Sequence, residues 1–158
     1  MDILLFKNES FLGKIIRFFT RGKYSHAAVR LDSGEIYEAV TKEGVRKLMG
    51  IKYIEGKNKI DVYTLNVPLN KINELNMRDF LDKQIGKKYD YWMVLGFVIK
   101  STRQGRKSRN RWYCSELCAA ALEKAGIQLL ITQPWKISPE MISYSPMISP
   151  RYWFRTNI

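Results

Sequence analysis

Histidine and cysteine are scarce in this sequence, which has one histidine, His26, and two cysteines, Cys114 and Cys118. The cysteines lie four residues apart on one predicted helix, in poor geometry for a disulfide, so nothing suggests an oxidised scaffold and a reducing compartment is favoured. The same three side chains leave a zinc shell unfilled unless carboxylates join them. We therefore expect no metal site and no cofactor.

Long hydrophobic runs are also absent. The longest, residues 91–99 (YWMVLGFVI), is far below the roughly 20 residues of a membrane-spanning helix. The first residues, MDILLFKNES, have an acid at position 2 and only a short apolar run, unlike a signal peptide. These absences predict a cytoplasmic protein. With 158 residues and 46% apolar content, we expect one domain over residues 1–158.

Acidic side chains are few: 15 Asp and Glu stand against 27 Lys and Arg, giving a net charge of +12 at pH 7. This excess predicts attraction to polyanions, which include nucleic acid, anionic polymers and anionic membrane surfaces. Residues 101–111 (STRQGRKSRNR) hold five basic residues and no acid. The segment is either a solvated loop or a binding patch beside Cys114, so Arg109, Arg111 and the adjacent Tyr113 are candidate substrate contacts.

Aromatic residues could support nucleic-acid binding, but here they are not interleaved with basic residues along one strand. We expect no specific nucleic-acid partner. A non-catalytic module that binds polyanions or nucleic acid, with an unreactive Cys114, remains the alternative from outside the enzyme class. The sequence leaves the oligomeric state open.

Hydrophobic periodicity predicts an α+β fold with a mostly antiparallel sheet. Strands are expected at residues 2–6, 25–31, 35–40 and 59–67, with a weaker candidate at 44–49. Helices are expected at residues 73–84, ended by Gly86, and at 92–99. A further helix, capped by Ser10 and reaching about Thr20, has an apolar stripe that we expect to cover the core rather than lie on a membrane.

Residues 111–126 (RWYCSELCAAALEKAG) predict a helix that begins near Cys114 and ends at Gly126. Cys114 then lies where unpaired backbone N–H groups favour an anion, and therefore a thiolate. Cys118 lies one turn inside, flanked by alanines and leucines, where a thiol behaves as a small hydrophobe. The two cysteines are therefore not equivalent, and Cys114 is the candidate nucleophile.

A cysteine nucleophile needs a base, and only His26 can supply an imidazole. Ala27, Val29 and Leu31 form an apolar strand face, which puts His26 on the other face. A three-residue loop at 32–34, with Gly34 left-handed, would make His26 and Glu38 diagonal neighbours on one face. A two-residue turn would instead shift the register and send Glu38 to the opposite face. Gly at the third loop position favours the first register.

These residue types suit attack on a carbonyl carbon. The Cys114 thiolate would form an acyl-thioester, and His26 would protonate the leaving group and then activate water or another acceptor. Glu38 would hold the imidazole and stabilise its charged form. The backbone N–H of Cys114 could donate to the developing oxyanion.

Four runs carry a resemblance to a known family: YSHAAVRLDSGEIYEAVTKEGVR, IGKKYDYW, YCSELCAAALEKAGI and ISPEMISYSPMI. Their order is similar to that of the circularly permuted branch of the papain-like NlpC superfamily, in particular YiiX/YebB-like proteins, in which the histidine strand precedes the cysteine helix. The resemblance implies Cys114 as nucleophile, His26 as base and Glu38 as orienting acid. It also implies a permuted papain-like (NlpC-type) fold, with a small antiparallel sheet or open barrel packed against the cysteine helix.

The resemblance leaves the substrate open, because related proteins include cell-wall peptide hydrolases, amidases and lipid acyltransferases. We predict a cysteine hydrolase, an amidase or peptidase, acting on a peptide or a peptidoglycan stem. Hydrolysis or transfer of a lipid acyl group at the same site is the alternative.

Overall fold

The computed structural model describes residues 1–7, 11–50, 60–91 and 110–151. A six-stranded sheet has the order β4-β3-β2-β1-β5-β8, with neighbouring strands antiparallel. Its strands are β1 (Asp2–Phe6), β2 (His26–Arg30), β3 (Glu35–Val40), β4 (Gly44–Met49), β5 (Ile60–Leu65) and β8 (Ile148–Pro150). A short parallel pair joins β6 (Lys88–Tyr89) to β7 (Arg111–Trp112).

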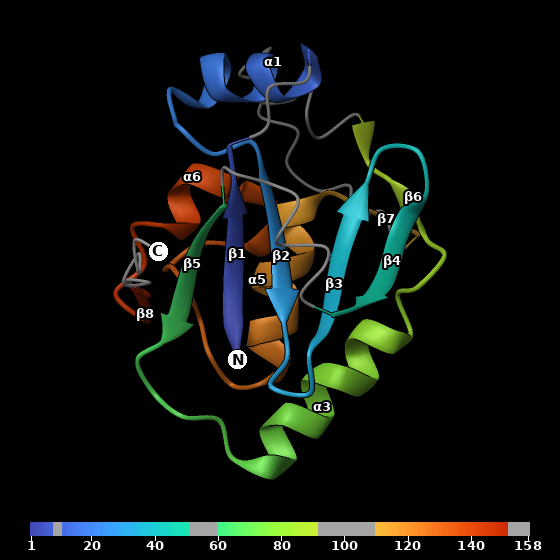
Figure 1. Ribbon diagram of the computed structural model, residues 1–158, viewed down its shortest axis with the longest axis vertical. Helices are drawn as coiled ribbons and strands as arrows, with labels where there is room; N and C mark the ends of the chain where they lie inside the picture. Colours follow the sequence, from blue (N-terminus) through green and yellow to red (C-terminus); the bar gives the residue numbers. More distant parts are fainter. Residues whose placement is uncertain (8–10, 51–59, 92–109, 152–158) are drawn as a thin grey trace, which may run out of the picture.

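Helices flank this sheet on one face and at both ends. The described helices are α1 (Phe11–Thr20), α3 (Lys71–Asp82), α5 (Cys114–Lys124), the 3-10 turn η1 (Pro134–Lys136) and α6 (Pro139–Ile142). In Figure 1, α5 lies behind the sheet, α1 crosses one end of it and α3 lies at the opposite end. Helix α5 packs against β2, β3 and α3. The arrangement is the predicted α+β fold with a mostly antiparallel sheet.

The core lies mainly between the sheet and α5. Ala27, Val29 and Leu31, the predicted apolar face of β2, join Leu117 and Leu122 of α5 in one buried cluster. A second, smaller cluster covers the other sheet face and contains Leu4, Phe6, Ala28, Ile36 and Val62. Strand β1, in the middle of the sheet, contributes Ile3 and Leu5 to the first cluster and Leu4 and Phe6 to the second, which is why these four residues are buried.

Most predicted elements are confirmed, with shifts of a few residues at their ends. Helix α3 begins at Lys71, two residues before the predicted start, because the Asn70 side chain caps it by accepting from the backbone N–H of Asn73 at 2.8 Å. The predicted helix at residues 92–99 and the Ser10 cap lie outside the described residues. So does nearly all of the basic segment at residues 101–111.

The loop between β2 and β3 has the predicted three-residue form. Gly34 has φ +89°, Leu31 and Glu35 are hydrogen-bonded at 2.9 Å, and Val29 pairs with Tyr37. Nothing lies within 4 Å of a Cβ added at Gly34, so its left-handed backbone is what favours glycine there. The register that places Ala28 opposite Glu38 is therefore confirmed.

Helix α1 packs only partly on the core, contrary to the expectation that its stripe would be covered. Within the stripe, Ile16 is buried but Phe19 is 41% exposed; Phe18, which lies outside the stripe, is 77% exposed. Helix α1 lies across the end of the sheet rather than along its face (Figure 1).

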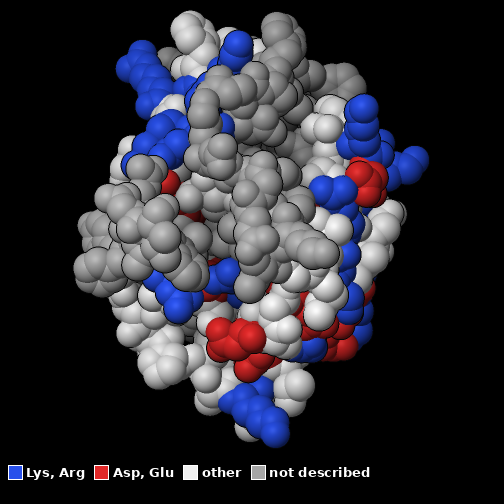
Figure 2. All heavy atoms as spheres, in the orientation of Figure 1, with Lys and Arg blue, Asp and Glu red and all other residues white. Residues whose placement is uncertain are grey.

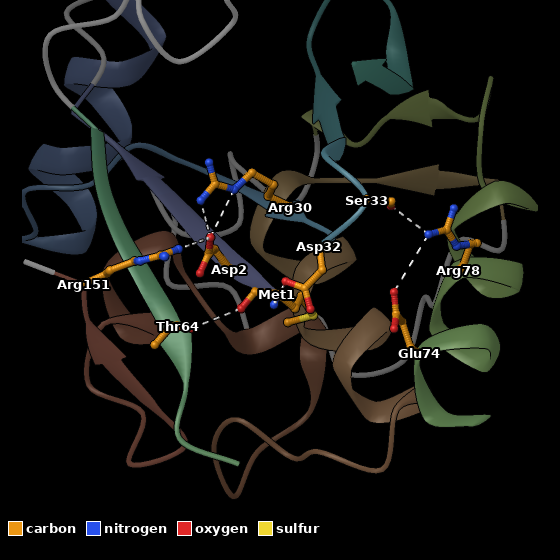
Figure 3. Close-up of polar contacts among 9 residues, drawn as sticks. All are labelled: Met1, Asp2, Arg30, Asp32, Ser33, Thr64, Glu74, Arg78 and Arg151. Atoms are coloured by element: carbon orange, nitrogen blue, oxygen red, sulfur yellow. Dashed lines mark hydrogen bonds and ion pairs between the residues drawn. The ribbon is translucent and has the colours of Figure 1, made fainter. Parts of the chain in front are cut away.

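Ion pairs link strands to one another at the end of the sheet opposite α1. The buried carboxylate of Asp2 accepts from Arg30 Nε at 3.1 Å and from Arg151 Nη1 at 3.2 Å, which links β1 to β2 and to the residue that follows β8 (Figure 3). The Thr64 hydroxyl donates to the Met1 carbonyl at 3.3 Å.

Across the described parts of the chain, no helix has the length and apolar character needed to cross a membrane.

Candidate active site

Cys114 is the first residue of α5, where the structure fixes the start of the helix firmly. Tyr113 is the N-cap residue, with an extended backbone. Its hydroxyl donates to the carbonyls of Ile137 and Trp135 at 2.5 and 3.1 Å, and the Ser115 hydroxyl donates to the same Ile137 carbonyl at 2.7 Å. Cys114 itself is only 2% exposed. The thiol is therefore held at a helix N-terminus, among backbone N–H groups that favour an anion.

His26 stands at the first position of β2 and contacts both of its predicted partners. Its Nε2 lies 2.6 Å from Glu38 Oε2. Cys114 also interacts electrostatically with the imidazole and raises its pKa. Because Nε2 is engaged by the carboxylate, Nδ1 is the ring nitrogen left for the sulfur. The ring of Phe6, on the neighbouring strand β1, packs 5.0 Å from the imidazole centroid and limits its rotation.

The Glu38 carboxylate is fully buried and both of its oxygens are engaged. Oε2 faces His26, while Oε1 accepts from Arg46 Nε at 2.9 Å and Arg46 Nη2 at 2.7 Å. Arg46 lies directly opposite Glu38 on β4, and its Nη1 also donates to Glu43 at 2.7 Å. A buried carboxylate without such partners would be costly, so Arg46 allows Glu38 to stay charged beside the imidazole.

The geometry of β2 and β3 explains how these side chains meet. The two strands pair at Val29–Tyr37 and Arg30–Ile36, near the loop. In Figure 1 they diverge toward His26 and Val40, and the start of α5 lies behind this opening. Side chains rather than a backbone ladder therefore connect the two strands at this end, and Cys114, His26 and Glu38 converge there.

The charge state of His26 follows from these contacts. Burial lowers its pKa, but the charge and hydrogen bond of Cys114, followed by those of Glu38, outweigh burial and raise the pKa to about 9. At neutral pH the imidazolium form is thus favoured when Cys114 is a thiolate. The arrangement can hold a thiolate–imidazolium pair ready for nucleophilic attack.

Tyr89 is a further neighbour of Cys114 to which sequence analysis gave no role. It lies on β6, pairs with Trp112 of β7 and is 4% exposed. Burial, then the charge of Cys114, raises the pKa of Tyr89. Tyr89 therefore remains an O–H donor beside the sulfur. The ring of Tyr91 packs 5.2 Å from that of Tyr89 and helps to hold it.

Arg46 and Tyr89 had weak signals in the sequence. Arg46 could be paired with Glu38 only by knowing the register between β3 and β4. Tyr89 stands in the run IGKKYDYW, which supported the family resemblance but did not distinguish one tyrosine from the other.

The three predicted substrate contacts, Tyr113, Arg111 and Arg109, differ in their exposure and in whether the structure describes them. The Tyr113 side chain is 1% exposed and its hydroxyl is bonded to backbone carbonyls, so it supports the start of α5 and is not free to touch a substrate. Arg111 is partly exposed on β7, where it pairs with Lys88. Arg109 lies outside the described residues. Cys118 is fully buried, as predicted, and burial raises the pKa of its thiol well above the usual value.

Two comparisons with known proteins agree on the fold. The solved structure of the metalloprotein yiiX from Escherichia coli O157:H7 matches with a TM-score of 0.72 and 18% sequence identity, over 96% of this chain and 94% of that one. The family described as permuted papain-like amidase enzymes (YaeF/YiiX, C92 family) matches residues 2–137. This chain belongs to that family. A comparison with curated proteins found no match.

The permuted papain-like fold predicted from the sequence is therefore confirmed. Membership of this amidase family makes the chain a papain-like amidase or peptidase at the level of class. In this permuted papain-like amidase the histidine strand β2 comes before the cysteine helix α5 in the chain.

Proposed function

We propose that the protein is a cysteine amidase or peptidase with Cys114 as nucleophile, His26 as general acid and base, and Glu38 as the acid that orients His26. One observation carries this proposal: the single histidine of the chain is bonded to a buried carboxylate at 2.6 Å, and the same imidazole interacts electrostatically with the cysteine at the start of a helix. Three residues far apart in sequence meet in the order that a thiol nucleophile requires.

In the first half of the reaction, the Cys114 thiolate attacks the carbonyl carbon and a C–S bond forms. The negative charge moves to the carbonyl oxygen, which accepts hydrogen bonds from the backbone N–H of Cys114 and from the Tyr89 hydroxyl. His26, charged at this stage, then gives its proton to the leaving amine as the C–N bond breaks. An acyl-thioester on Cys114 results.

In the second half, neutral His26 takes a proton from a water molecule, and the hydroxide attacks the thioester carbonyl. The C–S bond breaks, the acid is released and the thiolate–imidazolium pair is restored. Glu38 keeps the imidazole oriented throughout, and Arg46 keeps Glu38 charged. If an alcohol or amine takes the place of water, the same thioester gives acyl transfer.

Peptides or peptidoglycan stems are the proposed substrates, because the family is one of amidases. A lipid acyl group is the second candidate, favoured by the exposed apolar side chains of α1, Phe18 and Phe19. The basic residues of the chain favour an anionic substrate in either case.

The proposed mechanism uses no metal, although the Escherichia coli relative is called a metalloprotein. Among the described residues, no group of three or more His, Cys, Asp or Glu side chains is arranged to hold a metal ion. The Glu38 carboxylate, the acid that a metal ion beside His26 would need as a ligand, is already bonded to Arg46 and His26.

The test is turnover of amide and lipid acyl-ester substrates by the wild type, Cys114→Ala and Cys118→Ala, with intact mass spectrometry to trap the acyl-enzyme. We expect Cys114→Ala to lose at least about a thousandfold in kcat/KM and to accumulate no acyl adduct. Cys118→Ala, the matched control on the same helix, should keep the adduct and most of the activity. Turnover that persists in Cys114→Ala would overturn the assignment of the nucleophile.

A further inference from the structure

Helix α1 presents two adjacent phenylalanines to solvent. Phe18 is 77% exposed and Phe19 is 41% exposed, and their rings contact each other edge to face, with centroids 5.2 Å apart. The same helix is anchored, since Ile16 is buried in the main core. The exposed rings are therefore a fixed surface feature and not a frayed end.

Positive charge surrounds this aromatic pair. Lys14 and Arg21 are exposed, and the sequence contains no acid between Ser10 and Leu31. The Lys23 side chain is 57% exposed and lies 4.0 Å from the Asp61 carboxylate. Figure 2 shows Lys and Arg side chains at this end of the molecule. Exposed aromatic rings flanked by Lys and Arg on one helix are the pattern of a helix that lies in the interface of an anionic bilayer.

The connection between α1 and β2 is held in place. The Glu140 carboxylate accepts from the backbone N–H groups of Lys23 and Tyr24 at 2.7 and 3.1 Å. Gly22 permits this approach, because an added Cβ would lie 2.5 Å from side-chain carbons of Glu140. The same connection leads directly to His26, the first residue of β2. The exposed face of α1 is thus fixed at the end of the sheet where Cys114 and His26 meet (Figure 1).

We propose that α1 docks the protein on an anionic lipid surface, with Phe18 and Phe19 entering the interface and Lys14 and Arg21 facing the headgroup phosphates. The positive net charge and the positive charges on α1 both complement an anionic lipid surface. The paired rings favour a lipid surface over a soluble polyanion, because a soluble polyanion offers no apolar layer for them to enter. Docking in this position brings the Cys114 site to substrates held at the membrane, a consequence that rests on the proposed function.

The experiment is co-sedimentation of the full chain with phosphatidylcholine vesicles, with and without phosphatidylglycerol, at low and high salt. We expect binding that depends on phosphatidylglycerol and weakens with salt. Phe18→Ser combined with Phe19→Ser should lower the partition coefficient by about tenfold or more. Lys14→Gln combined with Arg21→Gln should weaken binding to anionic vesicles and leave the small binding to neutral vesicles unchanged.

A matched control is available on α3, at the opposite end of the molecule. Ile72 and Leu75 are 70% and 53% exposed there, and their double replacement by Ser should leave vesicle binding unchanged. The proposal is overturned if the protein does not bind anionic vesicles, or if the α3 variant loses as much vesicle binding as the α1 variant. It is also overturned if the protein binds duplex DNA more tightly than vesicles and the Phe replacements change neither kind of binding. Circular dichroism of each variant separates lost binding from lost folding.

Cys114→Ala distinguishes this proposal from the proposed function, because it should bind vesicles like the wild type. Vesicle binding without any Cys114-dependent turnover would overturn the enzymatic assignment and leave the docking surface standing. Cys114-dependent turnover of a soluble substrate without vesicle binding would overturn the docking surface and leave the enzymatic assignment standing.

Discussion

At the scale of residues, the candidate site is a series of contacts: Cys114 interacts with His26, and hydrogen bonds continue from His26 through Glu38 to Arg46. Each member fixes the next: the guanidinium engages one carboxylate oxygen, the other oxygen engages Nε2, and Nδ1 is left for the sulfur. Arg46 touches none of the reacting atoms in this arrangement. We predict that Arg46 is a positioning residue whose effect on catalysis passes through Glu38.

Replacement of Arg46 should therefore slow turnover without weakening substrate binding. Arg46→Lys keeps the charge but loses the fork that gives two hydrogen bonds to one oxygen, so we expect kcat to fall about tenfold with KM near the wild-type value. Steady-state kinetics measures the split. Glu43→Gln is the matched control, because it removes the charge of a second acid that Arg46 contacts and leaves Glu38 untouched. An unchanged kcat in Arg46→Lys would show that Glu38 is oriented without it.

At the scale of elements, the β2–β3 hairpin decides whether His26 and Glu38 can meet. The side-chain period of a strand is two residues, so a loop shorter by one residue would send Glu38 to the other face of the sheet. The conformation of Gly34 selects the longer loop. A short sequence signal thus predicted the contact on which the proposed site depends.

Changes at Gly34 should act through backbone conformation alone, because nothing lies within 4 Å of an added Cβ. Gly34→Ala should lower the free energy of unfolding by about 1 kcal/mol, since alanine resists a left-handed backbone, whereas Gly34→Asn should cost less. Urea denaturation of both variants measures the difference. Equal losses in the two variants would mean that the loop does not depend on the left-handed conformation.

At the scale of the whole molecule, the proposed site joins four separate parts of the chain: the start of β2, β3 with β4, the β6–β7 pair and the start of α5. Its electrostatics are therefore coupled to folding. The pKa of His26 is raised to about 9 in the folded protein, above the ordinary value of 6.5. Because the folded state binds a proton at His26 more tightly than the unfolded state does, protonation of His26 increases the free energy of unfolding.

The sign of the pH dependence follows. The contribution of His26 to stability should be complete below about pH 6.5 and should be lost as pH rises through 9. The difference in unfolding free energy between wild type and His26→Gln should fall across this window by an amount on the order of 1 to 3 kcal/mol. Denaturation at a series of pH values measures it, and NMR titration of the single histidine gives the midpoint directly. A midpoint at or below 6.5 would contradict the proposed thiolate–imidazolium pair.

The sequence by itself determined the elements and the identity of the candidate triad. The alternation of β2, the glycine in the hairpin loop and the helix formers around Cys114 are local signals, and local signals set strand faces, turn types and helix ends. A chain with one histidine also left one choice of base. The contact between His26 and Glu38 is confirmed, and the catalytic roles of both stay predictions.

Only the tertiary structure decided which residues support that triad and which surfaces stay exposed. Arg46 and Tyr89 reach the site through pairings between β3 and β4 and between β6 and β7, which no short stretch of sequence encodes. Tyr113, expected at the substrate, is instead buried by its bonds to the segment around Ile137. Phe18 and Phe19 are exposed because α1 crosses the end of the sheet. Such outcomes depend on how elements pack, and packing is a property of the assembled chain.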